Sequence, residues 1–416
     1  MNVCVIGLGY IGLPTAAVLA SKRVKVVGVD VNQLIVNTIN KGEIHISEPE
    51  LDILVREAVQ NNYLKAVIKP EKADVFMVAV PTPFKGNYKP DLSYIKSAAQ
   101  AIAKVLEKGN IVILESTSPV GTTEKMIKWM KEERYDLSFP EFGNNVFQSD
   151  ISVAHCPERV LPGDIVREIV ENDRVIGGVT SYCAVQAKNI YNIFVDANFI
   201  LTDCRTAELS KLVENSFRDV NIAFANELSL ICDKLDINVW ELIKLANHHP
   251  RVNILQPGPG VGGHCIAVDP WFIVDSLPEQ AKLIRAARLV NDSKPNFVLD
   301  KIEKAANSTG KEKSKLKITC LGLSFKPDID DLRESPAMII VDNVISMGFS
   351  EVLLVEPNIA VIPKRYKDKL VDLCSTNEAL KVADIVVLLV DHAPFKSINL
   401  ELLSGKQIVD TRGIWS

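Results

Sequence analysis

One of the chain's eight cysteines, Cys265, lies where a nucleophile could be presented to a ligand. It follows residues 257–263, which are too rich in glycine and proline for a helix or a strand. Glycine has no Cβ, so such a turn lets backbone or ligand approach closely. A free thiol is nevertheless more often a small, inert and buried hydrophobe. The turn alone leaves both interpretations open, and an acid four residues further on, Asp269, favours the catalytic one.

A dinucleotide-binding fingerprint opens the chain. A short apolar strand is predicted over residues 2–8, the pattern GxGxxG overlaps its end, and an alanine- and leucine-rich helix follows. A second apolar strand, 24–29, ends at Asp30, eighteen residues after the last glycine. The glycines allow a pyrophosphate to approach the helix N-terminus, and the acid suits the ribose hydroxyls. The carboxylate would repel a 2′-phosphate, so the sequence predicts NAD as the cofactor, bound by Gly7, Gly9, Gly12 and Asp30.

Two further strand ends could line the same pocket. Residues 73–80 and 111–114 are predicted strands, and they are followed closely by Thr82 and Thr117. Ligands of a doubly wound sheet lie outside the carboxyl ends of its strands, which places both threonines at the cofactor. Taken alone, each threonine is more often a helix cap.

Residues 151–163 combine a strand, prolines and the adjacent pair Glu158 and Arg159. The simpler explanation of this pair is a surface ion pair in a turn, which contributes little to stability. The run 175–178 is predicted to be the closing strand of the first domain.

A long helix is predicted from about residue 206 to residue 235. Its apolar residues recur at helical spacing and are expected to form the buried face: Leu209, Leu212, Val213, Phe217, Val220, Phe224 and Leu228. A second stripe is polar and could converge on one ligand or simply face solvent; it comprises Glu208, Lys211, Asn215 and Arg218. A lysine shielded from water on this stripe could serve as an acid or a base.

The last third of the chain is predicted to form a smaller α/β domain. A second helix, 239–246, leads to the basic segment 247–251, and a lysine-rich stretch at 310–315 indicates a linker. Beyond it the sequence predicts strands at 317–321, 351–355 and 385–390, with a last one beginning at residue 407. The turn after the first of these has Lys326 and Arg333 in place of the glycine pattern. Two cations suit a diphosphate, because charge-assisted contacts to phosphate are strong.

Together these elements predict an α/β protein with two Rossmann-like doubly wound domains joined by a central helical domain. The expected boundaries are 1–200 for the NAD-binding domain, 201–305 for the helical segment that carries the thiol, and 306–416 for the second nucleotide-type domain.

Composition narrows the class of protein. The chain has 416 residues, 47% of them hydrophobic, and a formal net charge of −5. These values are typical of a globular protein and argue against a nucleic-acid-binding surface, which needs a basic surplus. No apolar run approaches the roughly 18 residues of a membrane span, and no signal-peptide pattern opens the chain. The cysteines show neither CxxC pairs nor metal-ligand spacing, so we expect reduced thiols, no metal site and a cytoplasmic location.

With these motifs in place, the chain resembles the UDP-glucose/GDP-mannose dehydrogenase family along essentially its whole length. The motifs that carry the resemblance are, in order, 7–12, 80–83, 115–121, Lys211 with Asn215, 262–269 and 325–336. Six ordered motifs make a chance match improbable. The resemblance implies two successive NAD-dependent oxidations at C6 of a nucleotide sugar, from alcohol to aldehyde to carboxylate.

The resemblance also implies a role for each site residue. Cys265 is the nucleophile that adds to the aldehyde, Lys211 the proton donor and acceptor with Asp269 in its relay, and Glu158 the group that activates the hydrolytic water. Asn215 and Thr117 would hold the reacting oxygen or water. Further cofactor contacts are Tyr10, Ile11, Thr82, Thr117 and Arg333. The nucleotide-sugar contacts are Arg159, Val160, Lys211, Asn215, Arg218, His249, Arg251, Gly262, Lys326 and Arg412.

One position departs from the UDP-glucose branch of the family. A lysine usually precedes the aspartate of the cysteine loop, and this chain has Val268 there. The resemblance then implies a UDP-N-acetyl sugar as substrate, with UDP-N-acetyl-D-mannosamine expected ahead of UDP-N-acetylglucosamine. Relatives dimerise through the central helix, so a homodimer or a dimer of dimers is expected, with the segment 249–251 reaching the neighbour's site.

Two other classes of function remain as alternatives. A single-step dehydrogenase of related architecture would need the base but not the thiol. A regulator that binds NAD or a nucleotide sugar without turnover would keep the fold alone. The joint presence of Lys211, Asn215, Cys265 and Asp269 argues against the regulator.

Overall fold

The structure is a computed structural model that describes residues 1–86, 88–144, 148–161, 163–367, 369 and 371–415. The chain divides into two compact units, Met1–Glu214 and Asn215–Ser416. Each unit is built around its own sheet of mostly parallel strands, and helix α8 (Cys204–Leu235) begins in the first unit and ends in the second.

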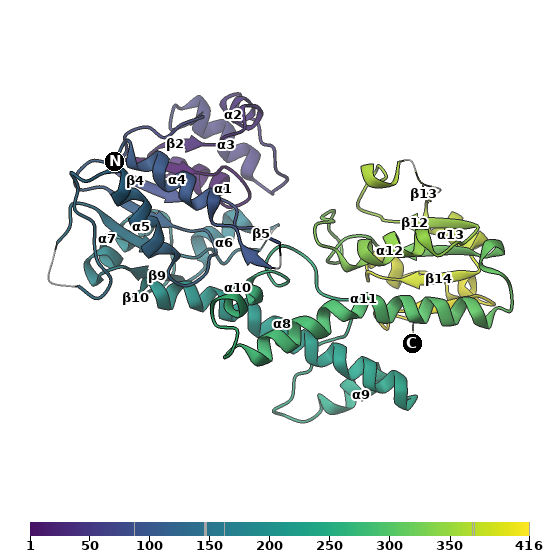
Figure 1. Ribbon diagram of the computed structural model, residues 1–416. Coiled ribbons are helices and arrows are strands. Elements are labelled where there is room, and N and C mark those ends of the chain that lie inside the picture. Colours follow the sequence, from purple (N-terminus) through teal and green to yellow (C-terminus); the bar gives the residue numbers. More distant parts are fainter. Residues whose placement is uncertain (87, 145–147, 162, 368, 370, 416) are drawn as a thin grey trace. The chain divides into compact units, whose positions relative to one another are not determined.

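An eight-stranded sheet forms the centre of the first unit (Figure 1). Its strand order is β10-β9-β8-β7-β4-β1-β2-β3, and neighbouring strands are parallel except for β8 with β9. The strands are β1 (Asn2–Ile6), β2 (Lys25–Val29), β3 (Leu64–Val67), β4 (Val75–Val78), β7 (Ile111–Leu114), β8 (Ser152–His155), β9 (Arg174–Gly178) and β10 (Phe199–Asp203). A separate antiparallel hairpin joins β5 (Phe84–Lys85) to β6 (Lys89–Pro90).

Helices cover both faces of this sheet. They are α1 (Gly12–Ser21), α2 (Gln33–Asn40), α3 (Leu51–Gln60), α4 (Ser93–Ala103), α5 (Thr122–Glu133), α6 (Ile165–Glu171) and α7 (Ser181–Tyr191). Along β1, Val3 and Val5 pack into one apolar core with α1, while Cys4 and Ile6 pack into the other with α4. Side chains of a strand alternate between its two faces, so two buried faces produce the continuous apolar runs seen in the sequence. The doubly wound arrangement predicted from those runs is confirmed.

The strand that closes the sheet is β10, so the prediction that 175–178 closes it is wrong. After β9, helix α7 crosses over and β10 pairs with β9 in parallel, Phe199 beside Arg174. An edge strand has a neighbour on one side only, and no residue of β10 is fully buried. Its sequence therefore lacks the apolar run that marks the inner strands.

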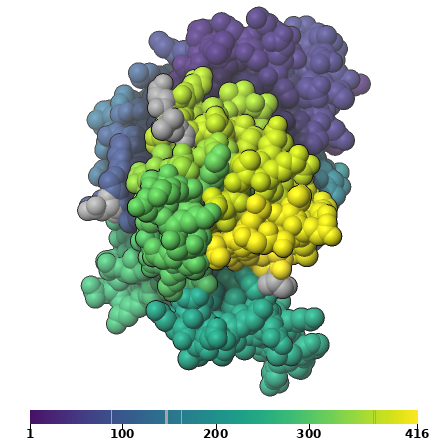
Figure 2. Space-filling view, turned by 90° about the vertical axis from the view of Figure 1, so that its right-hand side faces the viewer, coloured from purple at the N-terminus to yellow at the C-terminus, as the bar shows by residue number. Residues whose placement is uncertain are grey.

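A five-stranded parallel sheet forms the main part of the second unit. Its order is β13-β12-β11-β14-β15, with β11 (Lys317–Leu321), β12 (Glu351–Val355), β13 (Val371–Leu373), β14 (Ile385–Leu388) and β15 (Gln407–Asp410). The C-terminal half of α11 (Lys282–Ser308) and α12 (Pro336–Ser346) pack on one face, and α13 (Thr376–Val382) and α14 (Ala393–Lys396) on the other. The residues from about 310 onward present one continuous green-yellow to yellow surface in Figure 2. A second doubly wound domain is thus confirmed.

The second unit also contains two short helices beside α8. They are α9 (Val239–Ala246) and α10 (Asp269–Ser276). Helix α9 begins where expected because the side chain of Asn238 accepts the N–H groups of Trp240 and Glu241, which would otherwise lack partners in the first turn. Among the described residues, no helix combines the length and the apolar character needed to cross a membrane.

The predicted buried face of helix α8 is buried only in part. Leu212 is buried and Val220 and Leu228 are half-buried, whereas Leu209, Val213, Phe217 and Phe224 are 41%, 48%, 68% and 54% exposed. Polar side chains of the same helix are buried instead, namely Glu208, Asn215, Asp219 and Asn226. The spacing predicted the helix correctly and its buried face only in part, because periodicity shows that a face is apolar but not what covers it.

Candidate active site

Cys265 lies just before the short helix α10. Its side chain is exposed, whereas its carbonyl accepts the N–H groups of Val268 at 3.0 Å and Asp269 at 2.8 Å. On α8, Nδ2 of Asn215 donates to Oδ2 of Asp269 at 2.5 Å, and both of these side chains are buried. The structure therefore brings together three predicted catalytic residues: an exposed thiol and a buried amide–carboxylate pair, linked through the backbone of Asp269.

The glycines before the thiol pack directly on a loop of the C-terminal domain, residues 325–334. A Cβ on Gly262 would lie 2.6 Å from the carbonyl oxygen of Glu334. Gly263 has φ of 79°, which side chains rarely adopt, and donates its N–H to the carbonyl of Arg333 at 3.3 Å. Only glycine fits at either position. The predicted substrate residue Gly262 therefore joins the thiol's turn to the loop that carries two predicted ligand cations.

Arg412 reaches the start of the same turn. A Cβ on Gly258 would lie 2.4 Å from its Nη1. Its Nε donates to Oδ1 of Asp391 at 2.8 Å, and Nζ of Lys396 lies 3.3 Å from the other oxygen of that carboxylate. A predicted substrate contact from the end of the chain is thus a neighbour of the thiol's turn.

A buried hydrogen-bond network that the sequence did not reveal supports this turn. The N–H of Gly258 donates to Oδ1 of Asn226 at 2.9 Å, and Nδ2 of Asn226 donates to Oδ1 of Asn291 at 2.8 Å. Asn291 in turn donates to Oδ1 of Asp219 at 2.8 Å, which also accepts Nη1 of Arg288 at 2.7 Å. Buried polar groups need such partners, and here they fasten α11 and the turn to the polar face of α8.

Glu158 is not part of a surface ion pair with Arg159, so the simpler explanation from sequence is wrong. Glu158 is buried; its Oε2 accepts Nη1 of Arg174 at 2.7 Å and its Oε1 accepts the backbone N–H of Arg159 at 2.6 Å. The guanidinium of Arg159 pairs with Glu214 on α8. Both Glu158 oxygens are therefore held in fixed positions.

A second buried acid lies in the same cluster and was missed. Tyr191 donates its hydroxyl to Oε1 of Glu115 at 2.6 Å, while Oε2 of Glu115 has no hydrogen-bond partner among the described residues. Burial raises the pKa of Glu115 to about 7, helped by the negative charge of Glu158 and opposed by Tyr191 and Arg174. Its place directly after β7, at a carboxyl end of the sheet, was the available signal.

The cofactor turn after β1 fits a pyrophosphate. Gly7 has φ of 91°, and its N–H donates to the carbonyl of Val29 at 2.8 Å. A Cβ on Gly12 would lie 1.8 Å from the carbonyl oxygen of Gly7, whereas a Cβ on Gly9 would meet nothing within 4 Å. The fold thus requires glycine at positions 7 and 12. Gly9 instead leaves open space in front of the first turn of α1, as a bound phosphate requires.

Asp30 lies at the end of β2, where a ribose would be recognised. Its oxygens accept the N–H groups of Leu8 at 3.2 Å and Asn32 at 2.9 Å, and the residue is partly exposed. Tyr10 and Ile11 lie in the same turn, directly before α1, and Tyr10 is exposed. Through Leu8, Asp30 is therefore bonded to the turn that carries the five other predicted contacts: Gly7, Gly9, Tyr10, Ile11 and Gly12.

Thr82 and Thr117 are also brought together. Oγ1 of Thr82 donates to the carbonyl of Thr117 at 2.6 Å, which joins the loops after β4 and β7. Both threonines follow the carboxyl ends of strands, as expected, and the structure shows that these strands, β4 and β7, are neighbours. Neither forms a helix cap: α4 begins after Leu92 and α5 after Gly121.

Lys211 lies on α8, one turn before Asn215, and is half-buried. Arg218 lies on the next turn and is exposed. Glu208 does not belong with them as a ligand, because its carboxylate accepts the N–H groups of Gly121 at 2.6 Å and Thr123 at 2.7 Å. Glu208 therefore fixes the helix that carries Lys211 to the start of α5.

Other predicted contacts are spread over the chain. Val160 packs against the first apolar core. His249 and Arg251 are exposed in the segment after α9, where Nδ1 of His249 accepts the N–H of Arg251 at 3.3 Å. Within the described ranges, no group of three or more His, Cys, Asp or Glu side chains is arranged to hold a metal ion.

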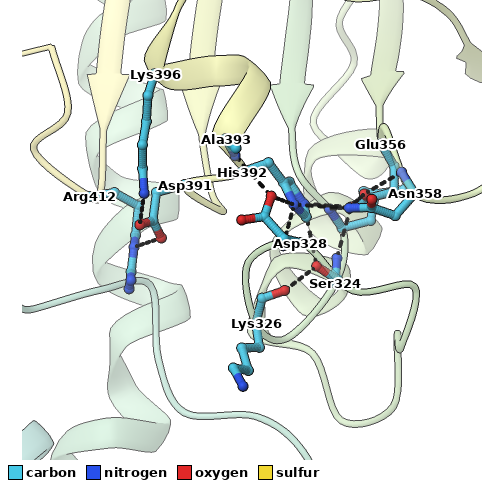
Figure 3. Close-up of polar contacts among 11 residues, drawn as sticks. Ser324, Lys326, Asp328, Glu356, Asn358, Asp391, His392, Ala393, Lys396 and Arg412 are labelled. Atoms are coloured by element: carbon cyan, nitrogen blue, oxygen red, sulfur yellow. Dashed lines mark hydrogen bonds and ion pairs between the residues drawn. The ribbon is translucent and has the colours of Figure 1, made fainter. Parts of the chain in front are cut away.

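The turn after β11 has a second acid that the sequence analysis did not single out. Gly322 has φ of 93° and donates its N–H to the carbonyl of Val355 at 2.8 Å. Glu356, directly after β12, accepts the N–H groups of Leu323 at 2.7 Å and Asn358 at 3.1 Å. Lys326 follows in this loop and is exposed, and Arg333 closes it, with Nη2 at 2.6 Å from Oδ2 of Asp331. Figure 3 shows Glu356 beside His392, with the Lys326 side chain directed away from both.

Comparison with known proteins matches each part of this architecture. Models of the UDP-glucose/GDP-mannose dehydrogenase family match residues 1–195 as the NAD binding domain, 205–293 as the central domain and 319–416 as the UDP binding domain. A UDP-N-acetyl-D-mannosamine dehydrogenase of Campylobacter jejuni is 64% identical over 400 residues, covering 96% of this chain and 97% of that protein.

Two further similarities extend over the whole chain. An NDP-N-acetyl-D-galactosaminuronic acid dehydrogenase of Ralstonia nicotianae is 59% identical, covering 100% of this chain and 96% of that protein. The solved structure of a UDP-D-ManNAc dehydrogenase from Pyrococcus horikoshii has a TM-score of 0.88 at 39% identity, covering 100% of this chain and 96% of that one. This chain belongs to the UDP-glucose/GDP-mannose dehydrogenase family.

Proposed function

We propose that this NAD-dependent nucleotide-sugar dehydrogenase oxidises UDP-N-acetyl-D-mannosamine at C6 to UDP-N-acetyl-D-mannosaminuronate. The 64% identity to the Campylobacter jejuni enzyme supports this substrate, as does Val268 in place of the lysine expected for UDP-glucose. The observation that carries the proposal is the turn at Cys265, where an exposed thiol is linked to the buried pair Asp269 and Asn215.

The first oxidation converts the C6 alcohol to an aldehyde. NAD, when bound at the Gly9 turn, supplies the hydride acceptor for each of the two oxidations. The alcohol must lose its hydroxyl proton as hydride leaves C6, and Lys211 is assigned as the acceptor, with Asp269 and a water in the relay. Asn215 donates to Asp269 at 2.5 Å and so fixes the carboxylate that takes part.

The second oxidation needs the thiol. An aldehyde is a poor hydride donor, but addition of the Cys265 thiolate to C6 forms a C–S bond and a thiohemiacetal, which is a good one. Loss of hydride from C6 gives a thioester. Water then adds to the thioester carbonyl, the C–S bond breaks, and the products are the carboxylate and the regenerated thiol.

Glu158 is assigned as the group that takes the proton from this water, with Thr117 helping to hold the reacting oxygen. Support comes from the fixed position of the Glu158 carboxylate, which is held by Arg174 at 2.7 Å and by the N–H of Arg159 at 2.6 Å. A general base must be held at a defined position to act on one water.

We assign the binding tasks to three segments: NAD to 1–200, the thiol to 201–305 and the UDP group to 306–416. The family matches at 1–195, 205–293 and 319–416 support this division. Cofactor contacts proposed besides Gly7, Gly9, Gly12 and Asp30 are Tyr10, Ile11, Thr82, Thr117 and Arg333. For the nucleotide sugar they are Arg159, Val160, Lys211, Asn215, Arg218, His249, Arg251, Gly262, Lys326 and Arg412.

The open apolar face of α8 supports a homodimer, or a dimer of dimers, built on this helix. Phe217 and Phe224 are 68% and 54% exposed, and a run of large apolar side chains in water favours association. The segment with His249 and Arg251 would then reach the partner's site. We place the activity in the cytoplasm, where eight cysteines without a disulfide framework stay reduced.

A second candidate substrate differs only in the sugar. The Ralstonia nicotianae relative, at 59% identity, is named for an N-acetyl-D-galactosaminuronic acid, so a UDP-N-acetylgalactosamine or UDP-N-acetylglucosamine substrate with the same chemistry is the alternative. Epimers of one sugar can differ in the direction of a single hydrogen-bonding group.

The test is NADH formation by the purified chain on UDP-N-acetylmannosamine, UDP-N-acetylglucosamine, UDP-N-acetylgalactosamine and UDP-glucose, with the product mass recorded. We expect two NADH per UDP-N-acetylmannosamine and little on the others. Cys265→Ala should abolish formation of the acid, and undiminished acid production would refute the thiol mechanism. One NADH per sugar would indicate the single-step alternative, and binding without any NADH would indicate the regulator.

A further inference from the structure

The buried side chain of His392 lies between Glu356 and the loop that carries Lys326. It lies four residues after the end of β14, and its ring is fully buried against the edge of Phe395, with ring centroids 5.4 Å apart. In Figure 3 it lies between Glu356 and Asp328. No role was assigned to His392 from the sequence.

The hydrogen bonds of His392 define which ring nitrogen carries the proton. Nδ1 lies 2.9 Å from the backbone N–H of Asp328 and 3.1 Å from Nδ2 of Asn358, and both of these groups are donors. Nδ1 is therefore the acceptor, and Nε2 carries the hydrogen that points to Oε2 of Glu356 at 3.0 Å. The ring works as a bridge from a buried carboxylate to the loop backbone.

Asp328 is the residue that this bridge holds. Its φ is 60°, a left-handed conformation that residues with a side chain rarely adopt. Its N–H donates to His392 at 2.9 Å, and its Oδ1 accepts the N–H of Ala393 at 2.9 Å. Strained conformations persist where surrounding contacts over-determine them, and here two adjacent residues supply those contacts.

Fixing Asp328 also fixes Lys326, two residues earlier. Oγ of Ser324 donates to the carbonyl of Lys326 at 2.7 Å, and the N–H of Ser324 donates to Glu356 at 3.1 Å. The backbone of Lys326 is thus held from both sides by the Glu356–His392 pair, while its side chain points away from the network (Figure 3). Asp391, the residue before His392, accepts a hydrogen bond from Nε of Arg412.

We propose that His392 is a positioning residue for the nucleotide sugar: it locks the 324–328 loop so that the Lys326 ammonium meets the diphosphate in one orientation. This inference rests on the proposed function for its ligand, and on hydrogen bonds among described residues for its mechanism. Burial alone would raise the pKa of Glu356, but the bonds from His392 and Leu323 lower it below its ordinary value, which keeps a carboxylate available to orient the ring.

Two substitutions separate the two ends of the bridge. His392→Asn places an amide oxygen near the position of Nδ1 and keeps an acceptor for the Asp328 N–H, but loses the donor to Glu356. His392→Gln keeps a donor near Nε2 and loses the acceptor at Asp328. We expect His392→Gln to raise KM for the nucleotide sugar about tenfold, with kcat and the KM of NAD within about twofold of wild type. His392→Asn should keep that KM within about twofold even if its Tm falls.

A double variant tests whether His392 acts through Lys326. If it does, His392→Gln combined with Lys326→Ala should bind UDP no more weakly than Lys326→Ala alone, because the loop then has no ammonium to position. Additive losses would overturn the proposal, as would equal KM values for the Asn and Gln variants or losses of kcat and of NAD affinity in step with Tm.

Hydrogen exchange at the Asp328 amide tests the lock without reference to turnover. We expect this amide to be protected in wild type and in His392→Asn and to exchange at least tenfold faster in His392→Gln. Unchanged protection in His392→Gln would overturn the proposal. If wild type produced no NADH from any nucleotide sugar, the proposed function would fail, while this readout and UDP affinity would still decide the role of His392.

Discussion

The turn after β1 and the turn after β11 are built from the same backbone bonds. In both, a glycine with φ near 90° donates its N–H at 2.8 Å to the last residue of the second strand, Gly7 to Val29 and Gly322 to Val355. In both, an acid directly after that strand accepts backbone N–H groups of the turns, two at Asp30 and three at Glu356. The sequences at the acids are correspondingly similar, VDVN at 29–32 and VEPN at 355–358.

The two turns differ in what surrounds the acid. Asp30 is partly exposed and the space at Gly9 is open, whereas Glu356 is 4% exposed and covered by His392. After the first turn, α1 begins at Gly12; after the second, a loop of mixed charge that carries Lys326 and Arg333 intervenes before α12 begins at Pro336. The same backbone arrangement thus has two uses. In the first turn the acid, Asp30, is open and suits a dinucleotide; in the second turn the acid, Glu356, is covered and holds the charged loop in place.

The largest effects should come from the glycines that both turns require. A Cβ on Gly12 would lie 1.8 Å from the carbonyl oxygen of Gly7, and a Cβ on Gly322 would lie 2.4 Å from Cβ of Val390. Gly12→Ala and Gly322→Ala should each destabilise the protein by roughly 2–4 kcal/mol, read as a large loss of Tm or of soluble yield. Gly9→Ala is the matched control: it should keep the wild-type Tm and raise the KM of NAD at least tenfold. A normal Tm for Gly12→Ala would contradict the required fit.

Exchanging the two acids for amides should give opposite results in the two domains. Asp30→Asn removes the charge offered to the ribose, so the KM of NAD should rise roughly 10- to 100-fold with little change in Tm. Glu356→Gln should leave the KM of NAD unchanged, because this carboxylate is buried, and should lower Tm by loosening its bonds to His392 and Leu323. A shift in NAD affinity for Glu356→Gln would mean that the second acid also meets a dinucleotide.

Smaller and opposite effects are expected from pH, because the two buried glutamates have pKa values shifted in opposite directions. Burial raises the pKa of Glu115 to about 7, so its stabilisation is present below about 4.5 and is lost as pH rises through 7. The Tm of Glu115→Gln should therefore match wild type near pH 5 and exceed it near pH 8, by an amount equivalent to at most roughly 3 kcal/mol.

Glu356 should show the reverse dependence. Its pKa is lowered, so its stabilisation is present above about 4.5 and is lost as pH falls through the folded-state pKa. Wild type should exceed Glu356→Gln in Tm at pH 7, and this difference should shrink as pH falls below about 4.5. If the Tm difference from wild type varied with pH in the same way for Glu115→Gln and Glu356→Gln, the pKa values of the two acids would not be shifted in opposite directions.

The sequence predicted the fold well because local patterns determine most of it. Apolar runs located inner strands such as β7 and β12, and the glycine spacing located the turn between β1 and α1. It failed at β10 and at the face of α8 for a shared reason: an edge strand and an exposed helix face depend on what lies beside them, and a single chain's periodicity carries no such information.

The sequence identified the motif residues of the candidate site but not the residues that hold them in place. The linkage of Cys265, Asp269 and Asn215 follows from motifs, but the partners that hold the site come from distant segments. Tyr191 reaches Glu115, and His392 reaches Glu356, across 76 and 36 residues of sequence. No spacing rule relates such pairs. The repeat of VDVN as VEPN was the one signal that could have identified Glu356 in advance.

The covered acid of the C-terminal domain has a consequence for competition between metabolites. Glu356 already accepts the N–H groups of Leu323 and Asn358 and the Nε2–H of His392, so it has no exposed oxygen to offer a ribose. If NAD binds at the turn with Gly9 and the sugar nucleotide at the turn after β11, as proposed, a rise in the NAD pool fills the first turn without displacing the ligand of the second. Excess cofactor should not act as a competitive inhibitor of the sugar, so flux would follow the supply of sugar nucleotide even when the dinucleotide is abundant.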